Sequence, residues 1–174
     1  VLVLHSYAED VSFVVDFNTA FQNTFRHPFN PIIYYSYMNT LNKQTTRYKN
    51  RAGQEAIQMI ERIRPDIILG VFTDANEYAV HNYINHPHIQ IVYNMKSDPA
   101  RFKYDTATNV QGTRGRPALK DLNDILLLAN PKRPIRIAHI GDLSASVRLY
   151  DKFLTDHEWK DILFVDSILV DNFP

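Results

Sequence analysis

The chain has 174 residues, of which 45% are hydrophobic and 22% are charged, which is enough to bury a core and excludes a compositionally disordered chain. Lys plus Arg and Asp plus Glu both number 19, so the sequence predicts neither nucleic-acid binding nor attachment to an anionic membrane surface. The absence of cysteine excludes disulfide bonds and Cys-ligated zinc or iron–sulfur sites.

Six short apolar runs predict β-strands, and the first five are nearly continuous in apolar or β-branched residues. Continuous runs are typical of parallel strands that are covered on both faces. In chain order the predicted strands are residues 1–6, 32–38, 66–72, 89–95, 135–141 and 162–170.

Segments with helical spacing lie between these strands. The side chains Ala52, Ala56, Ile60 and Ile63 recur at the spacing of one helix face. The same pattern covers residues 14–25, 119–129 and 147–154, and more weakly residues 78–84. The alternation of strand and helix predicts an α/β fold with a doubly wound parallel sheet.

Residues 96–117 interrupt this alternation with Pro and Gly and without helical spacing. Connections of this length inside a compact domain are uncommon and are usually functional or inter-domain. We therefore predict an N-terminal α/β lobe at residues 1–112 and the start of a second, incomplete α/β lobe at residues 113–174. Within the third predicted strand, Gly70 indicates close approach of a neighbouring backbone.

Ligands of open α/β sheets bind beyond the carboxyl ends of the strands, where helix N-termini and free backbone amides converge. The side chains at these ends are mostly hydroxyl, amide and aromatic, which suits a small polar molecule better than acid–base chemistry. The candidate ligand-binding residues are His5, Ser6, Tyr7, Asn39, Thr73, Asp74, Asn94, Asp142 and Ser144.

Several of these residues also have a structural interpretation. Asp74 and Glu77 have the spacing of a capping box at the start of the third helix. Asp142 and Ser144 are suitable N-caps for the fifth helix. Tyr7 suits packing over a helix end as well as contact with a ligand. The sequence leaves these alternatives open.

The motifs of nucleotide binding and of nucleophilic catalysis are absent from the sequence. Neither G-x-G-x-x-G nor G-x-x-x-x-G-K-[ST] occurs, and there is no G-x-S-x-G elbow. The histidines of residues 81–88 lie in surroundings typical of a polar helix end and turn. Residues 114–117 match the core of an AT-hook but have near-neutral flanks. We therefore predict no catalytic residue, cofactor, metal site or nucleic-acid partner.

Six short segments, in order along the chain, resemble one bacterial family. They are Leu4-His5-Ser6-Tyr7, Arg64-Pro65-Asp66-Ile67-Ile68, Thr73-Asp74-Ala75-Asn76, Ile91-Val92-Tyr93-Asn94, Ser97-Asp98-Pro99 and Asn109-Val110-Gln111-Gly112. On these segments the chain resembles the ABC-transporter substrate-binding-like proteins, a branch of the type 1 periplasmic binding fold that also supplies ectodomains to membrane sensors. Proteins of that fold have two complete lobes, so the resemblance implies one full lobe plus part of a second lobe here.

The resemblance implies an extracytoplasmic solute-binding or ligand-sensing domain, not an enzyme, which closes two lobes over a small polar molecule in the cleft between them. Its location would be periplasmic or extracellular, with membrane anchoring allowed, and its partner an ABC permease or a membrane sensor kinase. An enzyme of the α/β hydrolase type on a similar sheet is the alternative. The effector lobe of a transcription factor would need a helix-turn-helix upstream, which this chain does not show.

Two further expectations concern membranes and the ends of the chain. No apolar run approaches the roughly 20 residues of a membrane helix, so we expect no direct membrane insertion by this chain. The chain opens on apolar residues without a basic leader, and any signal peptide is expected to have been removed. The second lobe is expected to be truncated near Pro174.

Overall fold

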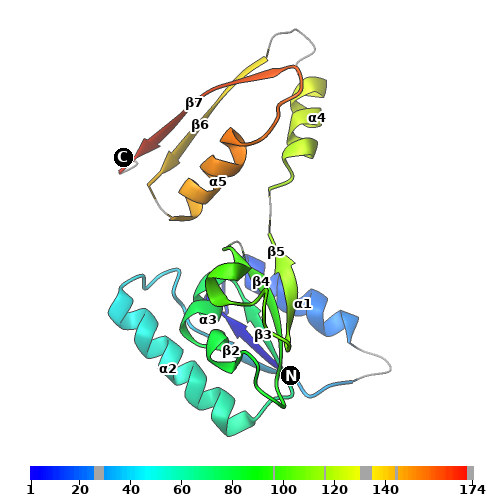
Figure 1. The fold of residues 1–174 in the computed structure, drawn as a ribbon, viewed down its shortest axis with the longest axis vertical. Helices are drawn as coiled ribbons and strands as arrows, with labels where there is room; N and C mark the ends of the chain where they lie inside the picture. The colour runs from blue at the N-terminus through cyan, green and yellow to red at the C-terminus, as the bar shows by residue number, and fades with distance from the viewer. Residues whose placement is uncertain (26–29, 96, 116, 130–134, 144, 172–174) are drawn as a thin grey trace. The chain divides into compact units, whose positions relative to one another are not determined.

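The computed structural model describes residues 1–25, 30–95, 97–115, 117–129, 135–143 and 145–171. The chain divides into two compact units, Val1–Gly115 and Arg116–Pro174, which we call unit 1 and unit 2 and describe separately (Figure 1). Both units are of the α/β type, because each combines a parallel sheet with helices.

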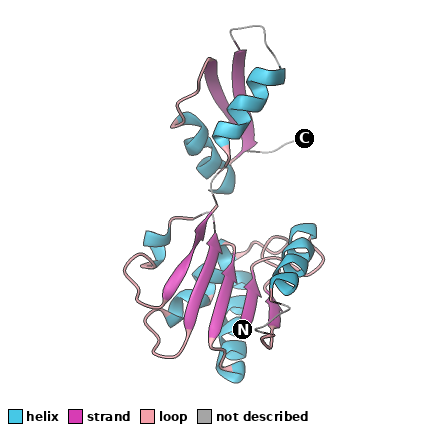
Figure 2. Ribbon diagram, turned by 90° about the vertical axis from the view of Figure 1, so that its right-hand side faces the viewer, coloured by secondary structure: helices cyan, strands magenta, loops and turns pink. Residues whose placement is uncertain are grey.

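Unit 1 is built on a five-stranded sheet in the order β2-β1-β3-β4-β5, and every neighbouring pair of strands is parallel. The strands are β1 (Leu2–His5), β2 (Tyr34–Tyr37), β3 (Ile67–Val71), β4 (Gln90–Met95) and β5 (Val110–Arg114). The helices between them are α1 (Ser12–Thr24), α2 (Thr46–Ile63) and α3 (Thr73–Tyr78), with the short 3₁₀ helices η1 (Val80–Tyr83) and η2 (Pro99–Phe102) (Figure 2). The predicted parallel α/β sheet is therefore confirmed for this unit.

The strand β5 corrects the expectation that residues 96–117 form one long connection. Val110 lies opposite Ile91 and Arg114 opposite Met95 in the pairing of β5 with β4. Gly112 permits this pairing, because a Cβ there would collide with the carbonyl oxygen of Tyr93. Unit 1 consequently continues past Gly112, where the predicted boundary stood.

Helices cover the sheet of unit 1 on both faces, which explains the continuous apolar runs of its inner strands. On one face, Leu4 and Ile68 are fully buried and pack in a cluster with Ala56 and Ile60 of α2. On the other face, Val3 and Val71 pack in a cluster with residues of α1. Complete burial of a Leu or Ile side chain contributes about 1.5–3 kcal/mol relative to exposure, so this core positions the strand ends firmly.

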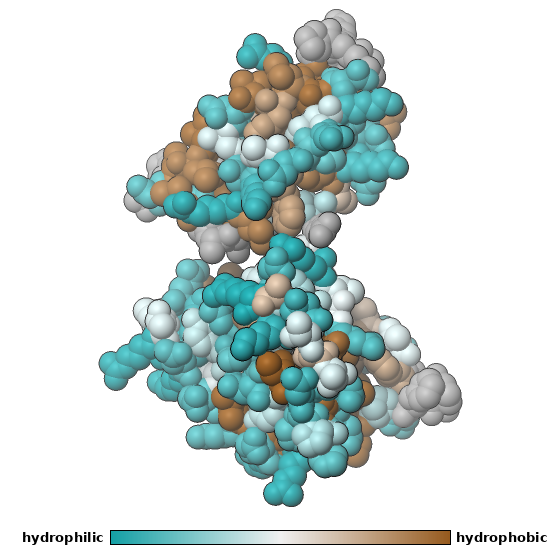
Figure 3. All heavy atoms as spheres, viewed as in Figure 1, coloured by the Kyte–Doolittle hydropathy of each residue, from teal (hydrophilic) through white to brown (hydrophobic). Residues whose placement is uncertain are grey.

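Unit 2 contains a two-stranded parallel sheet of β6 (Ile135–Asp142) and β7 (Ile162–Val170), with α4 (Leu119–Ala129) and α5 (Ala145–Thr155). The strand β6 is not part of the sheet of unit 1, as the sequence predicts. Large apolar side chains remain exposed in this unit, among them Ile125, Leu128 and Ile140, and Figure 3 shows apolar surface between its polar side chains. Within the described residues, every helix is too short or too polar to cross a membrane.

Candidate functional site

The strand order of unit 1 creates one topological switch point at the carboxyl edge of the sheet. The neighbour of β1 on one side is β2 and on the other side is β3, so the connections that follow β1 and β3 leave the sheet in different directions. Open α/β sheets bind their ligands at such a point. The residues to examine are therefore those that follow β1 and β3, with their neighbours on β2 and β4.

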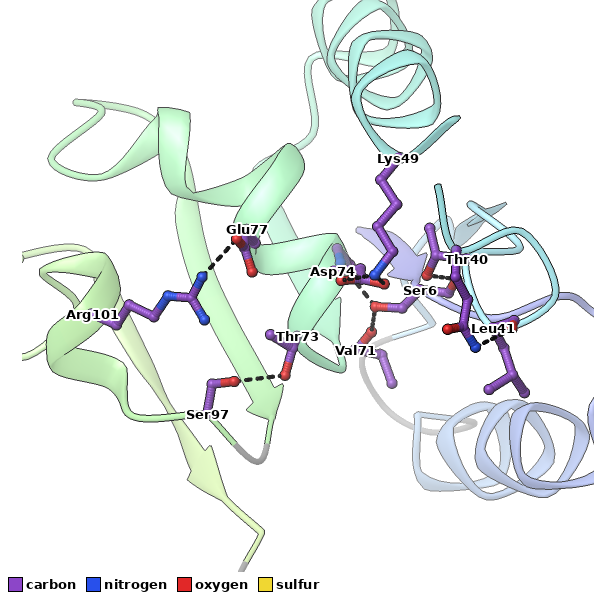
Figure 4. Close-up of polar contacts among 12 residues, drawn as sticks. Ser6, Thr40, Leu41, Lys49, Val71, Thr73, Asp74, Glu77, Ser97 and Arg101 are labelled. Carbon is purple, nitrogen blue, oxygen red and sulfur yellow. Dashed lines mark hydrogen bonds and ion pairs between the residues drawn. The ribbon is translucent and has the colours of Figure 1, made fainter. Parts of the chain in front are cut away.

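Ser6 fastens the ends of β1 and β3 together from inside the unit. Its hydroxyl donates to the carbonyl oxygen of Val71 at 2.9 Å and accepts from the amide of Ala75 at 2.8 Å. Thr40, which the sequence did not single out, donates through Oγ1 to the carbonyl oxygen of Ser6 at 2.8 Å (Figure 4). Ser6 is 1% exposed, so its side chain holds the two loops in place and is not available to a solute.

His5 lies in the interior of unit 1, covered by α1, and does not reach the surface at the carboxyl edge of the sheet. Successive strand residues point to opposite faces, and His5 follows Val3 on the face that α1 covers. Its ring is 0% exposed, its Nε2 lies 2.8 Å from Oδ1 of Asn18, and it stacks on Tyr37 with ring centroids 5.3 Å apart. Burial lowers the pKa of His5, against the hydrogen bond to Asn18, which raises it. The imidazole is thus a neutral interior group.

Three aromatic side chains gather at the switch point, and we call them the edge aromatic cluster: Tyr7, Phe13 and Phe72. The ring of Tyr7 stacks on Phe72 with centroids 4.3 Å apart and 25° between the planes, and Phe13 lies 4.9 Å from Phe72. Tyr7 and Phe72 are half-buried and Phe13 is 45% exposed. Burial raises the pKa of the Tyr7 phenol, and the charge of Asp74 raises it further. Tyr7 therefore stays protonated at neutral pH.

An ion pair lies beside this cluster. Lys49, in the first turns of α2, places Nζ 2.9 Å from Oδ2 and 3.1 Å from Oδ1 of Asp74 (Figure 4). Both side chains are partly exposed, at 22% and 18%. The pair joins α2 to the start of α3, two residues after Phe72 of the cluster. Sequence reasoning found Asp74 but missed Lys49.

Asp74 and Glu77 do not form the capping box that was one interpretation of their spacing. The N-cap position is Phe72, whose side chain makes no capping hydrogen bond, and the amide of Ala75 in the first turn donates instead to Oγ of Ser6. Glu77 instead accepts from Arg101 at 2.7 Å, and Oγ1 of Thr73 lies 3.0 Å from Oγ of Ser97 (Figure 4). These contacts tie α3 to the segment that follows β4.

The remaining candidates are Asn39, Asn94, Asp142 and Ser144, of which Asn94 lies beside Phe72. Asn39 has a φ of 53° and accepts from Nδ2 of Asn42 at 3.0 Å. Asn94 donates to Oγ1 of Thr113 at 3.3 Å, and its carbonyl oxygen accepts from the amide of Phe72 at 2.6 Å. Asp142 ends β6 in unit 2, and Ser144 lies outside the described residues. The structure thus brings Tyr7, Thr73, Asp74 and Asn94 to one edge of unit 1.

A serine, a histidine and an aspartate meet in unit 2, which bears on the hydrolase alternative. Nδ1 of His139 lies 3.1 Å from Oδ1 of Asp151 and 3.5 Å from Oγ of Ser167. The Ser167 hydroxyl donates to that same oxygen of Asp151. Activation of a serine requires a base that accepts its proton, whereas here the carboxylate accepts from both neighbours. The hydrogen bond from Ser167 and then that from His139 lower the pKa of Asp151. The group fastens α5 to β6 and β7 and lends no support to a nucleophilic serine.

A hollow of about 470 Å³ lies between the end of β2 and α2, and no residue of the edge aromatic cluster lines it. Its walls include Met38, Tyr48, Met59 and Arg62.

In the described part of the chain, no group of three or more His, Asp or Glu side chains could hold a metal ion. No protein-family model, curated protein or solved structure matches the chain significantly. The carboxyl edge of unit 1 therefore remains the candidate functional site.

Proposed function

We propose that the chain is a solute-binding or ligand-sensing domain that takes a small polar molecule at the carboxyl edge of the five-stranded sheet. The observation that carries this proposal is the position of Tyr7, Thr73 and Asp74. They follow the two strands that flank the topological switch point, and they are partly exposed. An aromatic face, a hydroxyl and a charge pair within one small area are the contacts that orient a small polar ligand.

The finer assignment follows from the sequence resemblance. We propose a type 1 periplasmic binding fold, a periplasmic or extracellular location, and a role in ABC-type uptake or in transmembrane signalling. The strand order of unit 1 and the second parallel sheet in unit 2 support this assignment, since a two-lobed binding protein needs an α/β core in each lobe. The chain's partner would then be an ABC permease or a membrane sensor kinase.

The test is a thermal-shift screen of the full chain against amino acids, nucleosides and small carboxylates. A solute at about 100 times its dissociation constant stabilises the folded state by about 2.7 kcal/mol. For a chain of this size, each kcal/mol raises the melting temperature by roughly 2–4 °C, so the expected shift is about 5–11 °C.

Two variants locate the site. Tyr7→Ala should abolish the shift, whereas Tyr34→Ala, which removes an exposed tyrosine of the edge strand β2, should retain it. Chromatographic recovery of the unchanged solute separates binding from turnover. The proposal is wrong if no solute shifts the melting temperature, or if the responding solute acts equally on the Tyr7→Ala variant.

A further inference from the structure

Phe72 has a backbone conformation that a large side chain rarely adopts. Its φ is 66° and its ψ is 175°, a region that is populated almost only by glycine. The surrounding structure holds it there: its amide donates to the carbonyl oxygen of Asn94 at 2.6 Å, and its carbonyl oxygen accepts from Nδ2 of Asn76 at 2.7 Å. Glycine would satisfy both hydrogen bonds without strain. The reason for phenylalanine at this position must therefore lie in its side chain.

Packing against the core accounts for only part of the surface of the Phe72 side chain. Phe72 packs against the buried cluster of Val3, Leu69 and Val71 but is itself only partly buried. Along α1, phenylalanines recur every four residues; Phe17 and Phe21 pack against that core, whereas Phe13 extends beyond it and is 45% exposed. The strained residue thus places its ring between Tyr7 and the exposed Phe13, at the switch point of the sheet.

We infer that the edge aromatic cluster is a stacking surface for a planar ring, so that the ligand of this site is an aromatic or heteroaromatic solute with a polar substituent. The inference rests on the proposed function. Aromatic rings attract one another in offset-stacked and edge-to-face arrangements, and a flat conjugated ligand gains this attraction beyond its apolar area. The ion pair of Lys49 with Asp74 is placed to contact the polar substituent, because Asp74 follows Phe72 by two residues at the start of α3 and both charged side chains are partly exposed.

The test compares matched pairs of solutes that differ only in the planarity of the ring. Benzoate is paired with cyclohexanecarboxylate, and benzamide with cyclohexanecarboxamide, so that the charge is the same within each pair. Isothermal titration calorimetry on the full chain should show that at least one planar member binds about 2- to 13-fold more tightly than its saturated partner. Equal affinity within both pairs would overturn the inference and leave the proposed function standing, as would tight binding of aliphatic solutes alone. If no solute of any class binds, the proposed function itself fails.

Substitutions at Phe72 distinguish the effect of backbone strain from that of contact between its ring and the ligand. Both Phe72→Gly and Phe72→Ala should lose the preference for planar rings, but only glycine relieves the backbone, so Phe72→Gly should unfold at a higher urea concentration than Phe72→Ala. At an ordinary strand or helix position the order is the reverse.

Phe13→Leu should weaken the binding of planar solutes without changing the urea midpoint, because Phe13 is exposed. Phe21→Leu is the control and should keep the binding of planar solutes. Retention of the planar preference in Phe72→Gly would overturn the inference.

Discussion

Adding one methyl group at Gly70 should destabilise unit 1 through the side chain of Asn76. A Cβ at Gly70 would lie 2.5 Å from Oδ1 and 2.9 Å from Cγ of Asn76. Asn76 is 0% exposed and cannot swing into solvent. The close neighbour is thus a side-chain amide and not the backbone that the sequence led us to expect.

The size of the loss in stability follows from the hydrogen bonds that the Asn76 side chain makes. Its Nδ2 donates to the carbonyl oxygens of Gly70 and Phe72, at 3.1 and 2.7 Å, and its Oδ1 accepts from the hydroxyl of Tyr104 at 3.0 Å. If Asn76 moves, buried groups lose their partners at about 1–3 kcal/mol each, in addition to about 1–3 kcal/mol for overpacking. Loss of one such partner together with overpacking gives about 2–6 kcal/mol, and we expect Gly70→Ala to lower the free energy of unfolding by this amount, out of a total of roughly 5–15 kcal/mol for a domain.

A double-mutant cycle with Asn76→Ala tests this reasoning by urea unfolding, followed by circular dichroism. Asn76→Ala alone should be strongly destabilising, because it leaves the same buried groups unpaired. In that background the methyl group at residue 70 enters vacated space, so Gly70→Ala should cost less than about 1 kcal/mol there. Additive effects of the two substitutions would refute the proposed clash.

Further predictions concern His5, Asp74 and Ser6, which lie at or next to the carboxyl ends of β1 and β3. Burial lowers the pKa of His5 below its ordinary value of 6.5, so the unfolded chain binds more protons, and the stability of the folded state should fall as the pH drops through about 6.5. His5→Phe should remove that part of the pH dependence of urea unfolding. Asp74→Asn removes a negative charge near Tyr7, and the Tyr7 phenol should then ionise at a lower pH in an absorbance titration. Ser6→Ala leaves the buried amide of Ala75 without its acceptor and should destabilise unit 1 by about 1–3 kcal/mol, whereas a change below 0.5 kcal/mol would contradict the fastening role of Ser6.

The sequence predicts most of the strands because short runs of apolar and β-branched residues leave a strong local pattern, which in β1 and β3 reflects nearly complete burial. The six predicted apolar runs correspond to β1 to β4, β6 and β7. The exception, β5, contains Gln111, Gly112 and Thr113, and its residues are partly or fully exposed. A strand without a buried apolar run carries no such pattern, and its pairing depends on the fit of Gly112 against Tyr93.

The candidate site was predictable in its location but not in its contacts. Parallel strands bring their carboxyl ends to one edge, so Tyr7, Asp74 and Asn94 are found from strand positions alone. Lys49 lies 25 residues from Asp74 in the chain, and no local pattern predicts that ion pair. The strain at Phe72 is likewise invisible in the sequence, because it arises from hydrogen bonds to groups on other elements. His5 was predicted to contact a ligand because it is a polar residue at a strand end, but its side chain points into the core.

Amide chemical-shift mapping of the full chain tests the central claim most directly. The isotope-labelled chain is titrated with a solute that raises its melting temperature, and the shift changes are assigned to residues. Binding at the carboxyl edge predicts that the largest changes fall on Tyr7, on residues 72–75 and on Asn94. The largest changes at the amino ends of β3 and β4, around Asp66 and Gln90, or along the hollow lined by Tyr48 and Met59, would contradict it.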